Sequence, residues 1–320
     1  MLPLPGSVPV DTVRFSLLAL MLLVTSAALA QPTPGSGTFT TIENLEFANA
    51  GGKSMLLDLR IPDGHGPFPV ILYLHSGAWI SGDRTGGPAI RQARRGYAVA
   101  SMEYRLAPEF TWPSQIEDAK AAVRWLRANA ARFNLDRARI GVWGTSAGGH
   151  IGSVLGTSGG EASLEGMQLG HAQFSSRVTA VVDFYGPTDL LKLDDQKLPC
   201  IPLDGNASYM PPSLLIGCPI QQCREKTETA NPIKYVTPDD PPFLIMHGML
   251  DCLVPFQQSV MLHSALEAAG VDATLIPIPT GDHGGRAFDE QQYQQIVSDW
   301  LDKNLRGAVV APVRRRAVRR

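Results

Sequence analysis

Apolar runs alternate with amphipathic segments along most of the chain. The run Pro69–His75 is almost continuously apolar, as expected for a strand buried on both faces of a sheet, whereas Met55–Ile61 alternates apolar and polar residues. Between Pro113 and Asn134, apolar residues recur at steps of three and four, which predicts a long amphipathic helix. Strand-forming and helix-forming segments therefore follow one another.

The alternation continues to the end of the chain and predicts one α/β domain at residues 41–305. We expect further strands at 41–47, 97–104, 139–143, 178–184, 241–246 and 273–278, and helices at 88–95, from 146 onward, at 257–269 and at 289–305. Such alternation is typical of a mostly parallel sheet with helices on both faces. Two irregular stretches, 159–176 and 190–237, contain no strand–helix series, so we interpret them as excursions from the same domain.

The first thirty residues predict an export signal. Arg14 precedes an apolar run that ends in small residues of the A-x-A type, with cleavage expected between Ala30 and Gln31. About 16 apolar residues fall short of the roughly 20 needed to span a bilayer, so an uncleaved anchor is the weaker alternative. We expect a linker at 31–40 and a secreted or periplasmic protein without stable membrane insertion.

The charge balance argues against one class of partner. The chain has 28 Lys and Arg against 30 Asp and Glu, a formal net charge of −2, whereas a nucleic-acid-binding protein should carry a basic excess. The chain ends in a run of basic residues, Arg314, Arg315, Arg316, Arg319 and Arg320. We interpret 306–320 as a solvated, disordered tail, with anion binding as the alternative.

A nucleophile motif lies between a predicted strand and a predicted helix. Residues 144–148 read Gly-Thr-Ser-Ala-Gly, and G-x-S-x-G in this context predicts a nucleophile elbow with Ser146 at its tip. The N-terminus of the following helix favours the negative charge that develops when such a serine reacts. Because serine alone is a weak nucleophile, a base and an orienting acid should follow along the chain.

Four histidines lie well past the elbow. His171 falls in an irregular stretch, His263 falls in mid-helix, and His247 closes a buried strand, where packing is its expected role. His283 sits in the glycine-rich loop after the last strand, which can carry an imidazole over the edge of the sheet toward Ser146. We predict His283 as the base.

The acid should follow a late strand. Asp251 comes shortly after the strand that ends near Met246. Asp282 is the rival, but its adjacency to His283 makes a hydrogen bond to that ring awkward. Asp183 and Asp189 follow an earlier strand, and we expect them to shape a turn. The sequence therefore favours Asp251.

Small residues after a central strand predict an oxyanion hole. Gly77 and Ala78 would donate backbone N–H groups, joined by the N–H of Ala147 behind the nucleophile. His75 is expected to be a structural hydrogen-bonding residue. Trp79 is a candidate for the substrate pocket, with core packing as the alternative.

Four cysteines, Cys200, Cys218, Cys223 and Cys252, predict disulfides in an exported protein. No histidine stands at ligand spacing beside Cys218 and Cys223, so a zinc site is the weaker alternative, and a free thiol is another. Three pairings exist. We expect Cys223–Cys252 with Cys200–Cys218, because a bridge from Cys252 into the 190–237 segment would hold the loop that carries the acid.

Five ordered motifs together resemble α/β-hydrolases of the hormone-sensitive-lipase-like type, and in particular the bacterial carboxylesterase and feruloyl-esterase-like group. They are His75–Trp79, Glu103–Pro108, Gly144–His150, Asp183–Gly186 and Gly281–Gly285. The resemblance implies an eight-stranded hydrolase sheet and ester hydrolysis without a cofactor or metal. It adds Tyr185 as a candidate substrate-binding residue. One departure is Ser76, where members commonly have glycine.

The sequence therefore predicts a secreted serine carboxylic-ester hydrolase that works through an acyl-enzyme. Expected substrates are short-chain acyl or aryl esters of the acetyl or feruloyl kind, either small or linked to a polysaccharide. The alternatives are an amidase, arylformamidase or peptidase with the same triad and, in a different class, a catalytically silent binding protein. The last is the weakest, because all three triad residues occupy their expected places.

Overall fold

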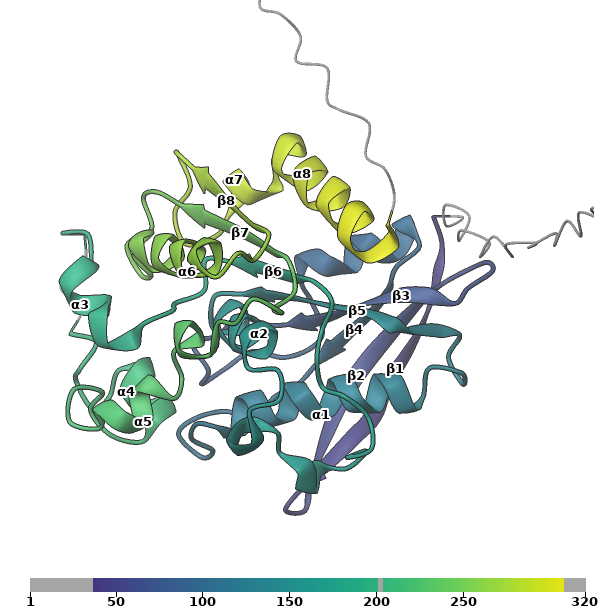
Figure 1. The fold of residues 1–320 in the computed structure, drawn as a ribbon, viewed down its shortest axis with the longest axis horizontal. Coiled ribbons are helices and arrows are strands. Elements are labelled where there is room, and N and C mark those ends of the chain that lie inside the picture. Colours follow the sequence, from purple (N-terminus) through teal and green to yellow (C-terminus); the bar gives the residue numbers. More distant parts are fainter. Residues whose placement is uncertain (1–36, 201–203, 308–320) are drawn as a thin grey trace, which may run out of the picture. The chain divides into compact units, whose positions relative to one another are not determined.

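The computed structural model describes residues 37–200 and 204–307. Within them, eight strands form one sheet in the order β1-β2-β4-β3-β5-β6-β7-β8 (Figure 1). The strands are β1 Phe39–Ala50, β2 Lys53–Pro62, β3 Phe68–Leu74, β4 Ala98–Met102, β5 Leu135–Thr145, β6 Val181–Phe184, β7 Phe243–Gly248 and β8 Ala273–Ile278. β2 runs antiparallel to its neighbours β1 and β4, and every other adjacent pair is parallel. The prediction of a mostly parallel, eight-stranded sheet is confirmed.

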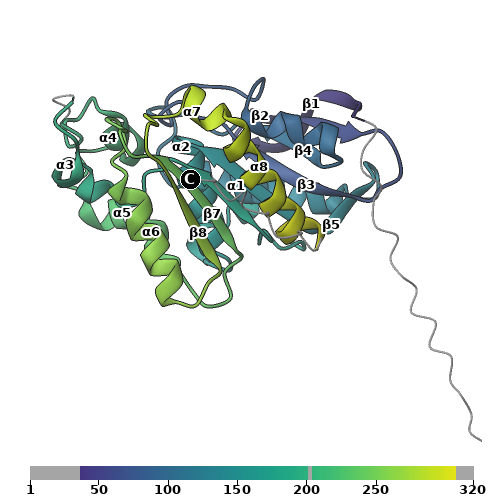
Figure 2. The same cartoon turned by 90° about the horizontal axis from the view of Figure 1, so that it is seen from above.

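Helices cover both faces of the sheet (Figure 2). The helices α1 (Ser114–Ala128), α2 (Ala147–Thr157) and α6 (Gln257–Ala268) contribute apolar side chains to the core on one face. The 3-10 helix η1 (Pro88–Arg95) and α8 (Gln291–Leu301) do the same on the other. The sheet is therefore the middle of three layers.

Strand β3 shows why its sequence is almost continuously apolar. All seven of its residues are buried. Val70 and Leu72 pack into the core shared with α1 and α2, whereas Ile71 and Tyr73 pack into the core shared with η1 and α8. Because successive side chains of a strand point to opposite faces, a strand with a helix layer on each side needs apolar residues at every position.

Two predicted helices end differently in the structure. Helix α1 stops at Ala128 rather than Asn134, and the side chain of Asn129 donates a hydrogen bond to the carbonyl of Trp125 there. The predicted helix 289–305 is interrupted at Glu290, whose extended backbone separates α7 from α8. In both cases the helical spacing of apolar residues extends beyond a residue with non-helical backbone angles, Asn129 or Glu290, so the spacing alone predicts a helix that is too long.

The stretches expected to be irregular contain short helices. They are η2 Ala162–Leu164, η3 Met167–Leu169, η4 Leu190–Lys192, α3 Leu193–Gln196, α4 Pro211–Ile216, α5 Arg224–Glu228 and η5 Pro232–Tyr235. Figures 1 and 2 both show α3, α4 and α5 gathered at one end of the sheet. In the described part of 190–237 no strand is present, so this part of the chain adds no strand to the sheet.

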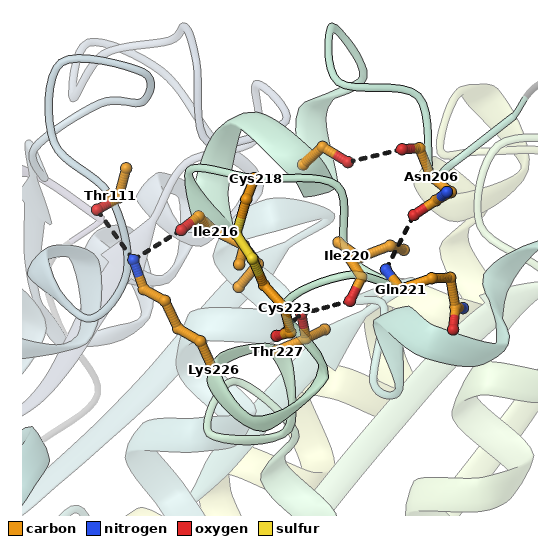
Figure 3. The surroundings of a disulfide bond; sticks show 10 residues. Thr111, Asn206, Ile216, Cys218, Ile220, Gln221, Cys223, Lys226 and Thr227 are labelled. Carbon is orange, nitrogen blue, oxygen red and sulfur yellow. Dashed lines mark hydrogen bonds between the residues drawn. A yellow bond between two sulfur atoms is a disulfide. The ribbon is translucent and has the colours of Figure 1, made fainter.

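One disulfide joins Cys218 to Cys223 between α4 and α5 (Figure 3). Beside it, the Nζ atom of Lys226 donates hydrogen bonds to the carbonyl of Ile216 and to Oγ1 of Thr111. The short helices are thereby tied to each other and to the loop before α1.

The second disulfide joins Cys200 to Cys252, so the predicted pairing of Cys223 with Cys252 and of Cys200 with Cys218 is wrong. Cys218 and Cys223 lie on either side of one short turn, with their Cα atoms 6.3 Å apart. Cys200, at the end of the segment that carries α3, instead reaches the loop after β7, with a Cα–Cα distance of 5.8 Å. Local geometry pairs the two nearest cysteines and leaves the distant two for each other.

Several predictions concern residues outside the described part of the chain. The signal peptide at 1–30, residues 31–36 of the linker and residues 308–320 of the basic tail lie there. The end of the predicted linker belongs to β1, which begins at Phe39. Arg306, the first residue of the predicted tail, belongs to the last helical turn and places its guanidinium 4.0 Å from the ring centre of Tyr97. No helix within 37–200 or 204–307 is long and apolar enough to cross a membrane.

Candidate active site

Ser146 lies at a sharp turn between β5 and α2. Its backbone adopts φ 54° and ψ −119°, a conformation that residues other than glycine rarely adopt. A Cβ atom on Gly144 would lie 2.0 Å from the carbonyl oxygen of Gly148, and one on Gly148 would lie 2.1 Å from that of Leu74. Both glycines are therefore required for the chain to cross itself here, as a nucleophile elbow demands.

Three predicted residues from three loops form one chain of hydrogen bonds. The Oγ atom of Ser146 lies 2.8 Å from Nε2 of His283, and Nδ1 of His283 lies 2.7 Å from Oδ2 of Asp251. Asp251 follows β7 and His283 follows β8. Since β5, β7 and β8 are parallel, their carboxyl ends meet at one edge of the sheet.

The carboxylate of Asp251 is fully buried and has hydrogen bonds at both oxygens. Oδ1 accepts the backbone N–H groups of Leu253 and Val254 at 2.9 and 2.8 Å. Burial alone would raise the pKa of Asp251. Hydrogen bonds from His247, His283 and the backbone of Val254 outweigh burial and lower the pKa to about 2. Asp251 is therefore ionised at ordinary pH and can support a positive charge on His283.

His247 also reaches this carboxylate, which sequence reasoning missed. Its Nε2 atom lies 3.1 Å from Oδ2 of Asp251, and the imidazole is fully buried at the end of β7. The signal in the sequence is the spacing of four residues to the acid in His-Gly-Met-Leu-Asp, directly after an apolar strand. The position of His247 at the end of a buried strand predicts packing and does not by itself indicate this bond.

The other candidate acids occupy structural positions. The Oδ1 atom of Asp282 accepts the backbone N–H of His283 at 2.7 Å, and no hydrogen bond joins its carboxylate to that ring in the described residues. Asp183 accepts the N–H of Gly186, and Asp189 accepts the N–H of Leu191, so both shape turns as expected. Burial raises the pKa of Asp183 to about 6, because its charged form is desolvated beneath the elbow.

The other late histidines lie away from the triad. The Nδ1 atom of His263 lies 3.4 Å from a carboxylate oxygen of Glu267, one turn further along α6. His171 begins a turn with a positive φ of 54°, and its carbonyl accepts the N–H of Phe174. Neither contacts Ser146 in the structure.

The loop after β3 has an unusual backbone. Gly77, Ala78 and Trp79 have φ angles of 124°, 52° and 61°, and two of these three residues carry a Cβ atom. Ala78 lines the cavity at Ser146 together with Ala147, whereas the cavity wall does not include Gly77. The carbonyl of Gly77 instead accepts the N–H groups of Ile80 and Ser81. Of the three predicted oxyanion donors, the structure thus brings Ala78 and Ala147 to the cavity.

Ser76, where glycine was expected, has a structural partner. Its Oγ atom donates a hydrogen bond to the carbonyl of Thr145 and lies 2.7 Å from Oγ1 of the same residue. The ring of His75 stacks on Tyr104 with centroids 4.1 Å apart, and the Tyr104 hydroxyl donates to the carbonyl of His75. Side chains therefore fix the loop to the residue just before the nucleophile and to the core.

Ser146 and His283 line a cavity of about 170 Å³ with mainly apolar walls. One wall comes from the segment after β6; its lining residues are Pro187, Leu193, Asp194, Lys197, Gly205, Met210, Pro211 and Pro212. Trp79 lines the cavity and also belongs to the buried core, so both of its alternative positions apply, and its Nε1 atom donates to Nδ1 of His150. Tyr185 does not line it. Its ring contacts the His283 ring edge-on at 4.8 Å, and substrate binding by Tyr185 stays a prediction.

The Cys200–Cys252 disulfide joins this wall to the loop of the acid. Cys252 directly follows Asp251 and itself lines the cavity. The bridge spans a sequence separation of 52, which stabilises the fold by about 4 kcal/mol on the loop-entropy model. A loop-borne carboxylate needs such support to keep its geometry toward His283.

We expect the double variant Cys200→Ser/Cys252→Ser to lower both the melting temperature and kcat. The matched control is Cys218→Ser/Cys223→Ser, which opens a bridge across a separation of only 5, worth about 2 kcal/mol on the same model. The control should lower the melting temperature less and leave kcat unchanged. Thermal unfolding and initial rates of both variants check this; an equal loss of kcat in the two would contradict a specific role for Cys252.

Comparison with known proteins shows the family to which this chain belongs. The BD-FAE family model matches residues 57–266. The chain is 33% identical to esterase LipC of Mycobacterium tuberculosis over 229 residues, which cover 70% of this chain and 54% of LipC. The chain thus spans about half the length of that curated relative.

Two solved structures share the fold along most of this chain. A truncated carbohydrate esterase from gut microbiota superposes with a TM-score of 0.72 at 30% identity, covering 85% of this chain and 98% of that one. A bifunctional GH43-CE protein of Bacteroides eggerthii superposes with a TM-score of 0.73 at 31% identity, covering 83% of this chain and 35% of its own.

Proposed function

Because this chain belongs to the BD-FAE family, the bifunctional feruloyl and acetyl esterases, we propose that it is an exported serine hydrolase of carboxylic esters. The observation that carries the proposal is the continuous hydrogen-bonded chain from Ser146 through His283 to Asp251, opening on an apolar cavity. A nucleophile, a base and an ionised acid in this order are what acyl transfer requires.

In the proposed acylation step, Oγ of Ser146 attacks the carbonyl carbon of the ester while its proton passes to Nε2 of His283. Asp251, held ionised, fixes the proton of His283 on Nδ1 and stabilises the imidazolium that forms. The backbone N–H groups of Ala78 and Ala147 stabilise the oxyanion. His283 then returns its proton to the alcohol oxygen as the carbon–oxygen bond breaks.

In the deacylation step, water takes the place of the alcohol. His283 accepts a proton from the water, whose oxygen attacks the acyl carbon, and the second oxyanion occupies the same site as the first. Collapse of this intermediate breaks the bond to Oγ of Ser146, which recovers its proton from His283. The carboxylic acid leaves, and no cofactor takes part in either step.

The cavity supports a small acyl group. Its volume of about 170 Å³ lies below the roughly 300–1,000 Å³ typical of pockets for drug-sized ligands. The walls from Leu193, Met210 and Pro211 are apolar, which suits an acetyl group or a single aromatic ring better than a long alkyl chain. The name of one solved relative, a carbohydrate esterase from gut microbiota, supports an alcohol that is part of a polysaccharide.

Two observations support export. All four cysteines are paired in disulfides, which persist in oxidising compartments outside the cytosol. The N-terminal run that follows Arg14 ends in small residues, as a cleaved signal does. We therefore place the mature protein in the periplasm or outside the cell.

A substrate panel tests the proposal. Initial rates are measured on nitrophenyl esters from acetate to long-chain acids, on a feruloyl ester of a sugar and on the anilide matched to the acetate. We expect kcat/KM to be highest for acetate or feruloyl esters, to fall with chain length and to be far lower for the anilide. A preference for the anilide would favour an amidase, and a preference for long chains would contradict the role given to the cavity.

A further inference from the structure

We propose that His247 is a positioning residue for the reaction: it holds the carboxylate of Asp251 in place for His283 by donating a hydrogen bond from Nε2. The proposal rests on the proposed function, since it assigns a role to a residue behind the triad. His247 contacts the acid, and the acid contacts the base.

The partners of His247 determine which of its nitrogens carries a proton. Nε2 lies 3.1 Å from Oδ2 of Asp251 and 2.9 Å from the carbonyl oxygen of Val254. Both are acceptors, and the pKa of Asp251 is lowered to about 2, so that side of the ring must present an N–H group. Nδ1 lies 2.7 Å from Oγ of Ser259, a hydroxyl that can donate to it. Every polar atom of the buried ring thus has a partner.

The carboxylate of Asp251 uses its two oxygens differently. Oδ1 accepts two backbone N–H groups of its own loop, which fixes that oxygen to the main chain. Oδ2 accepts the two imidazoles, His283 at 2.7 Å and His247 at 3.1 Å. In the part of the chain that the structure describes, His247 is therefore the one side chain besides the base that contacts Oδ2, the oxygen on which the orientation of His283 depends.

His247 occupies a rigid place in the fold. It belongs to β7, a strand buried along its whole length, and Ser259 belongs to α6. Its ring also contacts Phe256 edge-on, at a centroid distance of 5.8 Å. A donor on a buried strand between β6 and β8, bonded to the following helix, is better fixed than the loop that carries Asp251. His247 can therefore hold the carboxylate in a fixed position.

This position predicts a specific kinetic effect. His247 does not line the cavity at Ser146, so its replacement should change KM little. A misoriented acid would impair proton transfer by His283 rather than substrate binding. Displacing a catalytic group by about 1 Å can lower the rate by about 10- to 100-fold. We therefore expect the effect in kcat.

Two substitutions of His247 separate hydrogen bonding from packing. His247→Phe keeps an aromatic ring beside Phe256 and removes both nitrogens, whereas His247→Gln loses the ring and can place its Nε2 donor where the imidazole Nε2 was. We expect His247→Phe to lose about 10- to 100-fold in kcat with KM nearly unchanged, and His247→Gln to recover most of that loss. If packing were the role, the order would be reversed.

Leu262→Ala is the control for stability, because Leu262 is a buried residue of the same helix as Ser259. It should lower the melting temperature while kcat of the folded enzyme stays near the wild-type value. If His247→Phe does not fold, His247→Leu takes its place in the comparison with His247→Gln. Equal activity of the apolar and glutamine variants, or a loss of kcat that only follows the melting temperature, overturns the proposal.

The rate at which a phosphonate labels Ser146 gives a second measure, since labelling also needs an oriented His283. The labelling rate should fall in His247→Phe and return in His247→Gln. A wild-type protein that neither turns over esters nor is labelled overturns the proposed function and this role together. An active wild-type protein with an equally active His247→Phe overturns only the role of His247.

Discussion

Ester turnover by Ser146→Ala is expected to fall by about 10⁴- to 10⁶-fold in kcat, with little change in the melting temperature. The loss follows because the hydroxyl of Ser146, 2.8 Å from Nε2 of His283, is the group that would form the acyl-enzyme, and alanine has no such oxygen. Stability should be nearly unaffected, since the change removes one hydrogen bond at the cavity wall, worth about 1 kcal/mol. Initial rates and thermal unfolding of the purified variant measure both effects.

Ser158→Ala is the matched control for the nucleophile. Ser158 follows the last residue of α2, the helix that begins after Ser146, and its Oγ atom is buried with no hydrogen-bond partner in the described residues. This variant should keep wild-type kcat. Substantial turnover by Ser146→Ala, or labelling of a different serine by the phosphonate, would contradict the assignment of Ser146.

Local signals in the sequence were enough to predict the sheet and the elbow. The apolar run of β3 reflects burial of the strand on both faces. The alternation in β2 predicts a strand correctly, although its polar residues Asp58 and Arg60 are buried as well, where they bond to Arg84 and Ser101. Gly144 and Gly148 have no room for a Cβ atom, so the elbow is visible as a short motif. His283 and Asp251 could be predicted because parallel strands bring their loops to one edge of the sheet.

Contacts between distant segments could not be predicted in the same way. The pairing of Cys200 with Cys252 depends on the path of the segment after β6, which carries short helices with too few turns to show a periodic pattern. The hydrogen bond from His247 to Asp251 depends on the backbone conformation of the three residues between them. The contact between the rings of Tyr185 and His283 likewise joins residues far apart in the sequence.

The second large effect concerns the acid: Asp251→Asn is expected to lower kcat by about 10⁴-fold at neutral pH. The two backbone N–H groups at Oδ1 require an acceptor, so the amide oxygen should take that place and the amide NH₂ should take the place of Oδ2. The NH₂ group then donates to Nδ1 of His283 and moves the ring proton to Nε2. In that tautomer Nε2 cannot accept the proton of Ser146, 2.8 Å away.

Asp282→Asn is the matched control, because Asp282 is the neighbouring carboxylate and, among residues 37–200 and 204–307, its hydrogen bonds come from the backbone N–H groups of His283 and Cys252. An asparagine oxygen can accept both bonds, so this variant should keep kcat within a few-fold of the wild type. The amide in Asp251→Asn meets a second conflict, since it also faces the N–H of His247 and two donors cannot bond. If Asp282→Asn lost activity and Asp251→Asn kept it, the orienting acid would be Asp282, and the 2.7 Å contact between Asp251 and His283 would be structural only.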